Sequence, residues 1–170
     1  FTLATDGKFS EFKRLRQGWK TFDGLGLLVF GLGGGALFLL LGPDAGINAG
    51  RILPILEKLG LGGRNFLFFV VYHSLVNPWM EEVFWRGHLG STSRKVILSD
   101  ALFAGYHLLV LMLFIDLFWL ILAFVVLVLA AWFWRQITAR NGGLLVPAIS
   151  HLAADGSIML AVWVLVQIAD

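Results

Sequence analysis

The stretch that decides the fold is "LFWLILAFVVLVLAAWFW", Leu117 to Trp134, in which every residue is apolar. A helix needs about 20 mostly apolar residues to cross the hydrocarbon layer of a membrane. The whole chain is 58% hydrophobic and 14% charged. A soluble domain is usually about 45–50% apolar and about 25% charged. The composition therefore predicts a protein that crosses a membrane several times.

Four further segments on either side of this run are apolar enough, or nearly so, to cross a membrane. They are Gly24–Leu41, Asn65–Met80 with an extension to Leu89 left open, Val96–Ile115 and Leu144–Ile168. We therefore predict an all-α, polytopic membrane helix bundle with about five transmembrane helices. The third and fourth spans meet at Asp116, which predicts a tight hairpin. The glycine-rich first span permits close helix packing, which we expect within the chain rather than between two copies.

A basic and aromatic segment, "KFSEFKRLRQGWKTF", precedes the first span. Its aromatic residues recur at near-helical spacing among lysines and arginines, as in an interfacial amphipathic helix. A plain juxtamembrane anchor that only orients the chain is the simpler reading, because orientation requires basic flanks. We expect one domain over 1–170, with this helix in 1–23 and the transmembrane core in 24–170. Phe1 in place of Met leaves a processed N-terminus open.

The positive charges predict the orientation of the bundle. With the N-terminus in the cytoplasm and five spans, ten of the 13 Lys and Arg residues fall inside or at the inner boundary. The other three lie in the outer loop 42–64, where "RILPILEKLGL" is expected to form a short interfacial helix. The same count places the C-terminus outside.

The second span carries an unusual group of ionisable residues, in "NPWMEEVFWRGHLG" from Asn77 to Gly90. Ionisable groups inside a membrane are costly and mark functional sites by default. Glu82 and Arg86 are four residues apart and can pair on one helix face. Glu81 is rotated by about 100° from Glu82 and can point elsewhere, with Asn77 four residues before it. Asn77-Pro78 predicts that the helix kinks or restarts there.

Two more spans carry polar residues with a companion four residues away. Phe103 and His107 lie in the third span, and His151 and Asp155 lie in the fifth. From the helical rise, His107, His151 and Glu81 fall at similar depths in the cytoplasmic half of the membrane.

Three other ionisable residues in or near the spans are expected to have ordinary roles. His73 has no polar neighbour in sequence and is expected to be a packing histidine. His88 and Asp100 are expected to lie at the membrane boundary.

A carboxylate beside histidines in a dry cavity can act as a general base toward water. A histidine and a second polar side chain can stabilise a developing oxyanion, and together these groups would hydrolyse an amide. Glu81, His107 and His151 would also suit a divalent metal such as zinc, with Asp155 as a fourth ligand. A non-catalytic membrane protein, transporter-like or of the immunity type, is a third reading. For Glu82 and Arg86 taken alone, an ion pair that only stabilises the helix explains the pattern as well.

Three motifs in this order resemble those of the CAAX protease and bacteriocin-processing family of glutamic intramembrane proteases. "EEVFWRG" matches EExxxR, "FAGYH" at Phe103–His107 matches FxxxH, and "HLAAD" at His151–Asp155 matches Hxxx(N/D). The resemblance covers Asn77 to Asp155.

The resemblance implies a metal-independent endopeptidase with no cofactor. Glu81 would activate water with help from His107, and Glu82 and Arg86 would hold the site together. The family places His151 and the residue at Asp155 in an oxyanion hole, but an ionised Asp155 cannot donate a hydrogen bond. We therefore expect Asp155 to orient and charge His151.

The expected partners are a membrane-anchored peptide or protein substrate, cut near its C-terminus, and the lipid bilayer. No nucleic acid is expected, and the oligomeric state is left open. The expected location is the bacterial cytoplasmic membrane, as a multi-pass protein with a cytoplasmic N-terminus.

Overall fold

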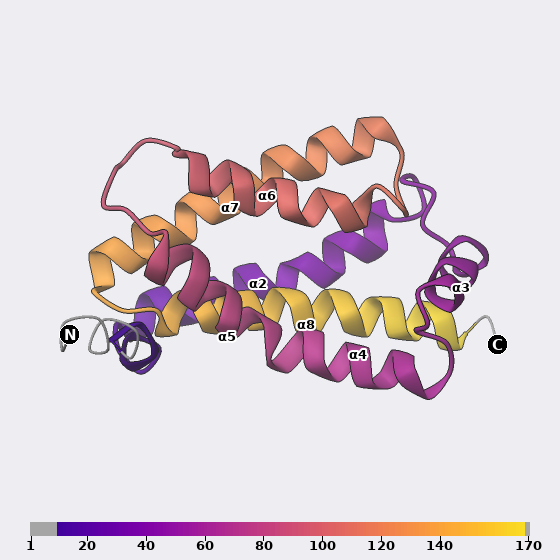
Figure 1. Cartoon of the computed structure of the whole chain (residues 1–170), viewed down its shortest axis with the longest axis horizontal. Coiled ribbons are helices and arrows are strands. Elements are labelled where there is room, and N and C mark those ends of the chain that lie inside the picture. The colour runs from indigo at the N-terminus through magenta and orange to yellow at the C-terminus, as the bar shows by residue number, and fades with distance from the viewer. Residues whose placement is uncertain (1–9, 169–170) are drawn as a thin grey trace, which may run out of the picture.

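The computed structural model describes residues 10–168, and within this range the chain is helical and contains no strand (Figure 1). Of the interfacial helix expected in 1–23, residues 10–14 are helical and residues 15–20 form a turn and an irregular segment. Residues 1–9 lie outside the described residues. The helices that follow are α2 (Thr21–Leu41), α3 (Ala49–Lys58), α4 (Arg64–Leu75), α5 (Asn77–Glu82), the π-helix η1 (Val83–His88), α6 (Leu98–Leu111), α7 (Leu117–Asn141) and α8 (Leu145–Gln167).

Three of these helices, α2, α7 and α8, are long and apolar enough to cross a membrane. They contain the predicted spans Gly24–Leu41 and Leu117–Trp134 and nearly all of Leu144–Ile168. Large apolar side chains cover their outer faces, and Leu40 and Phe118 are 73% and 70% exposed. Such faces are costly in water and favourable in lipid. The protein is therefore an integral membrane helix bundle.

The other two predicted spans differ from the expectation. The span expected at Val96–Ile115 is helical only in α6, whose 14 residues rise about 21 Å against a hydrocarbon core of about 30 Å. The second span is divided, because α4 ends at Leu75 and α5 begins at Asn77 with Pro78 in its first turn. A proline lacks the N–H that would continue the first helix. The break at Asn77-Pro78 is confirmed, whereas the count of five crossings stays a prediction.

Glycines bring α2 and α8 into close contact. The backbone N–H of Gly35 donates to the hydroxyl of Ser157 at 2.9 Å. A Cβ atom on Gly35 would lie 2.7 Å from the carbonyl carbon of Ser157, which is closer than packing allows. Gly31 meets Ser150 and Ala153 in the same way. The glycine run therefore serves packing within the chain, as expected.

The segment that precedes α2 packs against the turn between α7 and α8 and accepts two backbone hydrogen bonds there. The backbone N–H of Leu144 donates to the carbonyl of Arg14 at 2.9 Å. The N–H of Leu145 donates to the carbonyl of Gln17 at 3.1 Å. The first N–H groups of a helix have no partner within the helix, so the N-terminal segment supplies two acceptors at the start of α8. This end of the bundle lies opposite the end where α8 finishes (Figure 1).

The two remaining local expectations are confirmed. Helices α6 and α7 pack against each other and are joined by a short turn that ends at Asp116. The loop 42–64 contains the expected short helix as α3, whose N-terminus is capped by the side chain of Asn48, which accepts from the N–H of Arg51 at 3.0 Å. The position of α3 at the outer membrane surface stays a prediction.

Candidate active site

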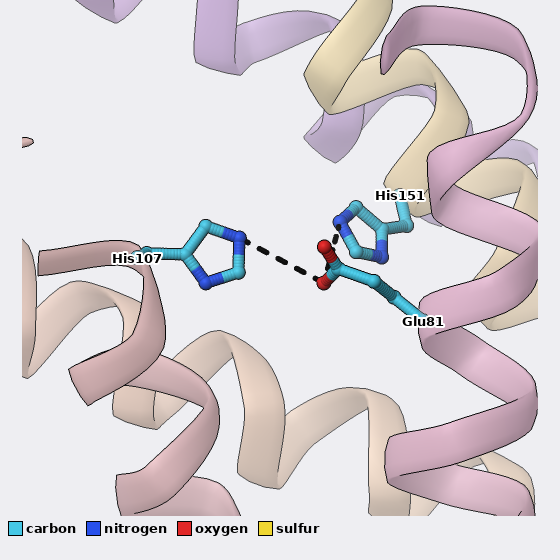
Figure 2. A group of neighbouring side chains, drawn as sticks. All are labelled: Glu81, His107 and His151. Atoms are coloured by element: carbon cyan, nitrogen blue, oxygen red, sulfur yellow. Dashed lines mark ion pairs between the residues drawn. The ribbon is translucent and has the colours of Figure 1, made fainter. Parts of the chain in front are cut away.

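Three helices bring Glu81, His107 and His151 together. They come from α5, α6 and α8, and Figure 2 shows the two imidazoles turned toward the Glu81 carboxylate. Glu81 Oε2 lies 3.8 Å from His107 Nε2 and 4.0 Å from His151 Nε2. These separations are too long for direct hydrogen bonds, and Glu81 Oε2 is buried without a hydrogen-bond partner within residues 10–168.

Each of the three side chains is held from behind. The amide of Asn77 donates to Glu81 Oε1 at 2.7 Å, which leaves Oε2 directed at the histidines. His107 Nδ1 lies 2.8 Å from the carbonyl oxygen of Phe103. A carbonyl only accepts, so Nδ1 carries the proton and Nε2 of the neutral ring presents a lone pair toward Glu81.

Glu82 holds His151 through its other ring nitrogen. His151 Nδ1 lies 2.9 Å from Glu82 Oε1, and Arg86 Nη1 lies 3.1 Å from the same oxygen. Glu82 is fully buried and His151 nearly so. The carboxylate therefore links the arginine to the histidine and directs His151 Nε2 toward Glu81.

The pair formed by Glu82 and Arg86 lies where the backbone changes form. Glu82 ends α5, and Arg86 lies in the π-helix η1. π-Helices are rare and occur frequently at functional sites. The spacing of four residues still lets the two side chains meet.

Aromatic rings surround the arginine and the histidines. The Phe103 ring is buried, with Arg86 Cζ 4.2 Å and the His107 ring 4.4 Å from its centre. The indole of Trp134 stacks on His151 at 4.7 Å and donates from Nε1 to Ser150 Oγ at 3.0 Å. The sequence analysis did not single out Trp134, because nothing distinguishes it from the other apolar residues of its run.

Asp155 lies between two histidines. Its Oδ1 is 3.5 Å from His151 Nε2, and its Oδ2 is 3.6 Å from His73 Nε2. The hydrogen bond to His151 Nδ1 thus comes from Glu82, while a carboxyl oxygen of Asp155 lies beside Nε2, and the expected role of Asp155 stays a prediction. His73 was expected to be a packing histidine, and this expectation was incomplete. Its ring stacks on Phe69, but its polar partner comes from another helix, which spacing along one helix cannot reveal.

A second buried ion pair supports the loop before α6. Arg135 donates to both oxygens of Asp100, at 2.9 and 2.7 Å, and to the carbonyls of Ser91, Ser93 and Lys95. The expected position of Asp100 at the membrane boundary stays a prediction, but its side chain is buried within the bundle. The physical reason is the fixed fork of the arginine, which satisfies the carboxylate inside the bundle.

The ligand atoms of Glu81, His107 and His151 all lie within 4.8 Å of one another, so the group also has the composition of a metal site. Four ligands at about 2.1 Å around zinc lie about 3.4 Å apart. Two hydrogen bonds of about 2.8 Å to one water span about 4.6 Å at a tetrahedral angle. The observed 3.8 and 4.0 Å fall between these values.

The fold and the site define a helical membrane protein with a buried cluster of one carboxylate and two histidines. A model of the family described as type II CAAX prenyl endopeptidase Rce1-like matches residues 63–157, more than half of the 170-residue chain. The chain belongs to this family, and membership indicates a protease, hence a hydrolase, in a membrane. No curated protein and no solved structure matches the chain.

Proposed function

We propose that the protein is an intramembrane endopeptidase in which Glu81 activates a water molecule for attack on a peptide carbonyl. The observation that carries the proposal is the meeting of Glu81 and two differently held histidines at 3.8 and 4.0 Å. Both Glu81 Oε2 and the free lone pair of His107 Nε2 accept hydrogen bonds. A water that donates to both would turn its oxygen lone pair toward the substrate.

The proposed reaction assigns a role to each group. Glu81 takes a proton from water as the oxygen bonds to the carbonyl carbon, and the protonated carboxyl returns that proton to the leaving amine. His151 with both nitrogens protonated donates through Nδ1 to Glu82 and through Nε2 to the oxyanion. The negative charges of Glu82 and Asp155 favour this protonated form. Arg86 holds Glu82 in place.

The proposed substrate is a membrane-anchored peptide or protein, cut near its C-terminus. Family membership supports a prenylated CAAX sequence as the first substrate to test. The excess of lysine and arginine on one side supports a cytoplasmic N-terminus, and the proposed location is a bacterial inner membrane. We also propose that residues 1–170 form one domain.

The decisive variant is Glu81→Gln, because glutamine keeps the shape and an acceptor for Asn77 but cannot take the proton. We expect loss of cleavage of a prenylated CAAX peptide, followed by mass spectrometry, with unchanged helical content. Full cleavage by the folded variant would refute the role of Glu81. Glu57→Gln on α3, outside the cluster, is the matched control and should cleave normally.

A zinc-dependent protease is the second candidate, because Glu81, His107 and His151 form a metal-competent group. The Nδ1 atoms of the two histidines contact a backbone carbonyl and the Glu82 carboxylate, as in metal-binding histidines. The test is cleavage after dialysis against a chelator. Lost activity restored by zinc would favour the metal, whereas unchanged activity would favour the water activated by Glu81 alone.

A further inference from the structure

A cavity of about 170 Å³ is lined by three arginines. Arg86 comes from η1, Arg135 from α7, and Arg14 from the N-terminal segment. A water takes up about 30 Å³ in the liquid, so the cavity has room for a small polyatomic ion.

The rest of the lining suits an anion. Ser91, Thr92 and Thr138, which carry hydroxyl groups, are among the lining residues. Among residues 10–168, no carboxylate lines the cavity. The acids that pair with the arginines are Glu11, Glu82 and Asp100, and a Cβ atom on the lining residue Gly87 would lie 2.8 Å from Glu11 Oε2.

Two of the lining residues hold buried donors without a hydrogen-bond partner. Arg86 is 3% exposed, and neither Nη1 nor Nη2 has a hydrogen-bond partner within the described chain, although Nη1 is ion-paired with Glu82. The hydroxyl of Thr138 is buried and equally unpartnered within residues 10–168. Buried donors without acceptors cost about 1–3 kcal/mol each, so an acceptor that reached these groups would offset that cost.

We infer that this cavity is a binding site for a phosphate-class oxyanion, held by Arg86, Arg14 and Thr138. Guanidinium groups and hydroxyls that converge on one small cavity match the several acceptor oxygens of phosphate. Arg135 contributes charge rather than donors, because Asp100 and loop carbonyls already occupy its nitrogens. The source is either free phosphate or the headgroup of an anionic lipid.

The test uses inorganic phosphate as the probe and the full chain in neutral detergent at constant ionic strength. Binding is measured by calorimetry, so the result does not depend on peptidase activity. Thr138→Val removes the hydroxyl and keeps the shape, and Arg14→Gln removes a charge. Each variant should weaken phosphate binding about tenfold or more, because each loses a hydrogen bond to a charged group. Arg16→Gln, from the same segment but outside the cavity, is the matched control and should bind as the original chain does.

A second arm separates the two sources. The protein is reconstituted in phosphatidylcholine with and without phosphatidylglycerol, and lipid retained after purification is measured by mass spectrometry. Retention of phosphatidylglycerol by the original chain and its loss in Arg14→Gln, with no binding of free phosphate, would support the site with lipid as its source. Binding of neither probe, or equal binding by both variants and the original chain, would overturn the inference.

Discussion

Replacing Glu82 by glutamine should lower the free energy of unfolding, whereas the same change at the adjacent Glu81 should leave it nearly unchanged. Glu82 is fully buried, and its Oε1 lies 3.1 Å from Arg86 and 2.9 Å from His151. Glutamine leaves the buried Arg86 charge without its paired carboxylate. Breaking a buried pair in this way costs about 3–5 kcal/mol. We therefore expect Glu82→Gln to lower the free energy of unfolding by about that amount and to reduce cleavage as well.

The matched variant Glu81→Gln separates stability from chemistry. Glu81 lies beyond hydrogen-bond distance from both histidines, and a glutamine oxygen can still accept from Asn77. Its unfolding free energy should stay within about 1 kcal/mol of the original value. The assay is unfolding by sodium dodecyl sulfate in mixed micelles, followed by circular dichroism. The reasoning on Glu82 would be refuted if Glu82→Gln also stayed within about 1 kcal/mol.

Three more variants test other parts of the structure. Gly35→Ala should destabilise the bundle in the same unfolding assay, because the new Cβ would clash with Ser157 of α8. Gly33→Ala is the control, because nothing lies within 4 Å of its new Cβ, and it should gain up to about 1 kcal/mol of stability from helix propensity. Arg135→Lys should lower the unfolding midpoint, since a lysine cannot make the bidentate contact with a buried carboxylate, and an unchanged midpoint would contradict this. Asp155→Asn should lower the cleavage rate, and an equal or higher rate would show that its charge does not support His151.

The sequence predicted those features that depend on composition and on spacing within one helix. The three long apolar helices, the break before Pro78 and the pairing of Glu82 with Arg86 all follow from local chemistry. The contact of Asn77 with Glu81 follows in the same way.

Contacts between helices were harder to predict, because they depend on how the helices face one another. His73 has no polar partner on its own helix but lies 3.6 Å from Asp155 of α8. The pairing of Asp100 with Arg135 of α7 could not be predicted from spacing along one helix. An ionisable residue on each of two hairpin-connected helices was a usable signal for this second pair. The length of α6 was overestimated, because hydropathy does not show where a helix bends into a turn.

The docking of the N-terminal segment on α8 has a consequence for biosynthesis. The amides of Leu144 and Leu145, at the start of α8, pair with carbonyls of Arg14 and Gln17, which leave the ribosome well before α8 does. Contacts of such large sequence separation form late and slow folding. Until α8 emerges, the glycine face of α2 lacks the helix that covers it, so the contact between these two helices forms only after α8 has been made.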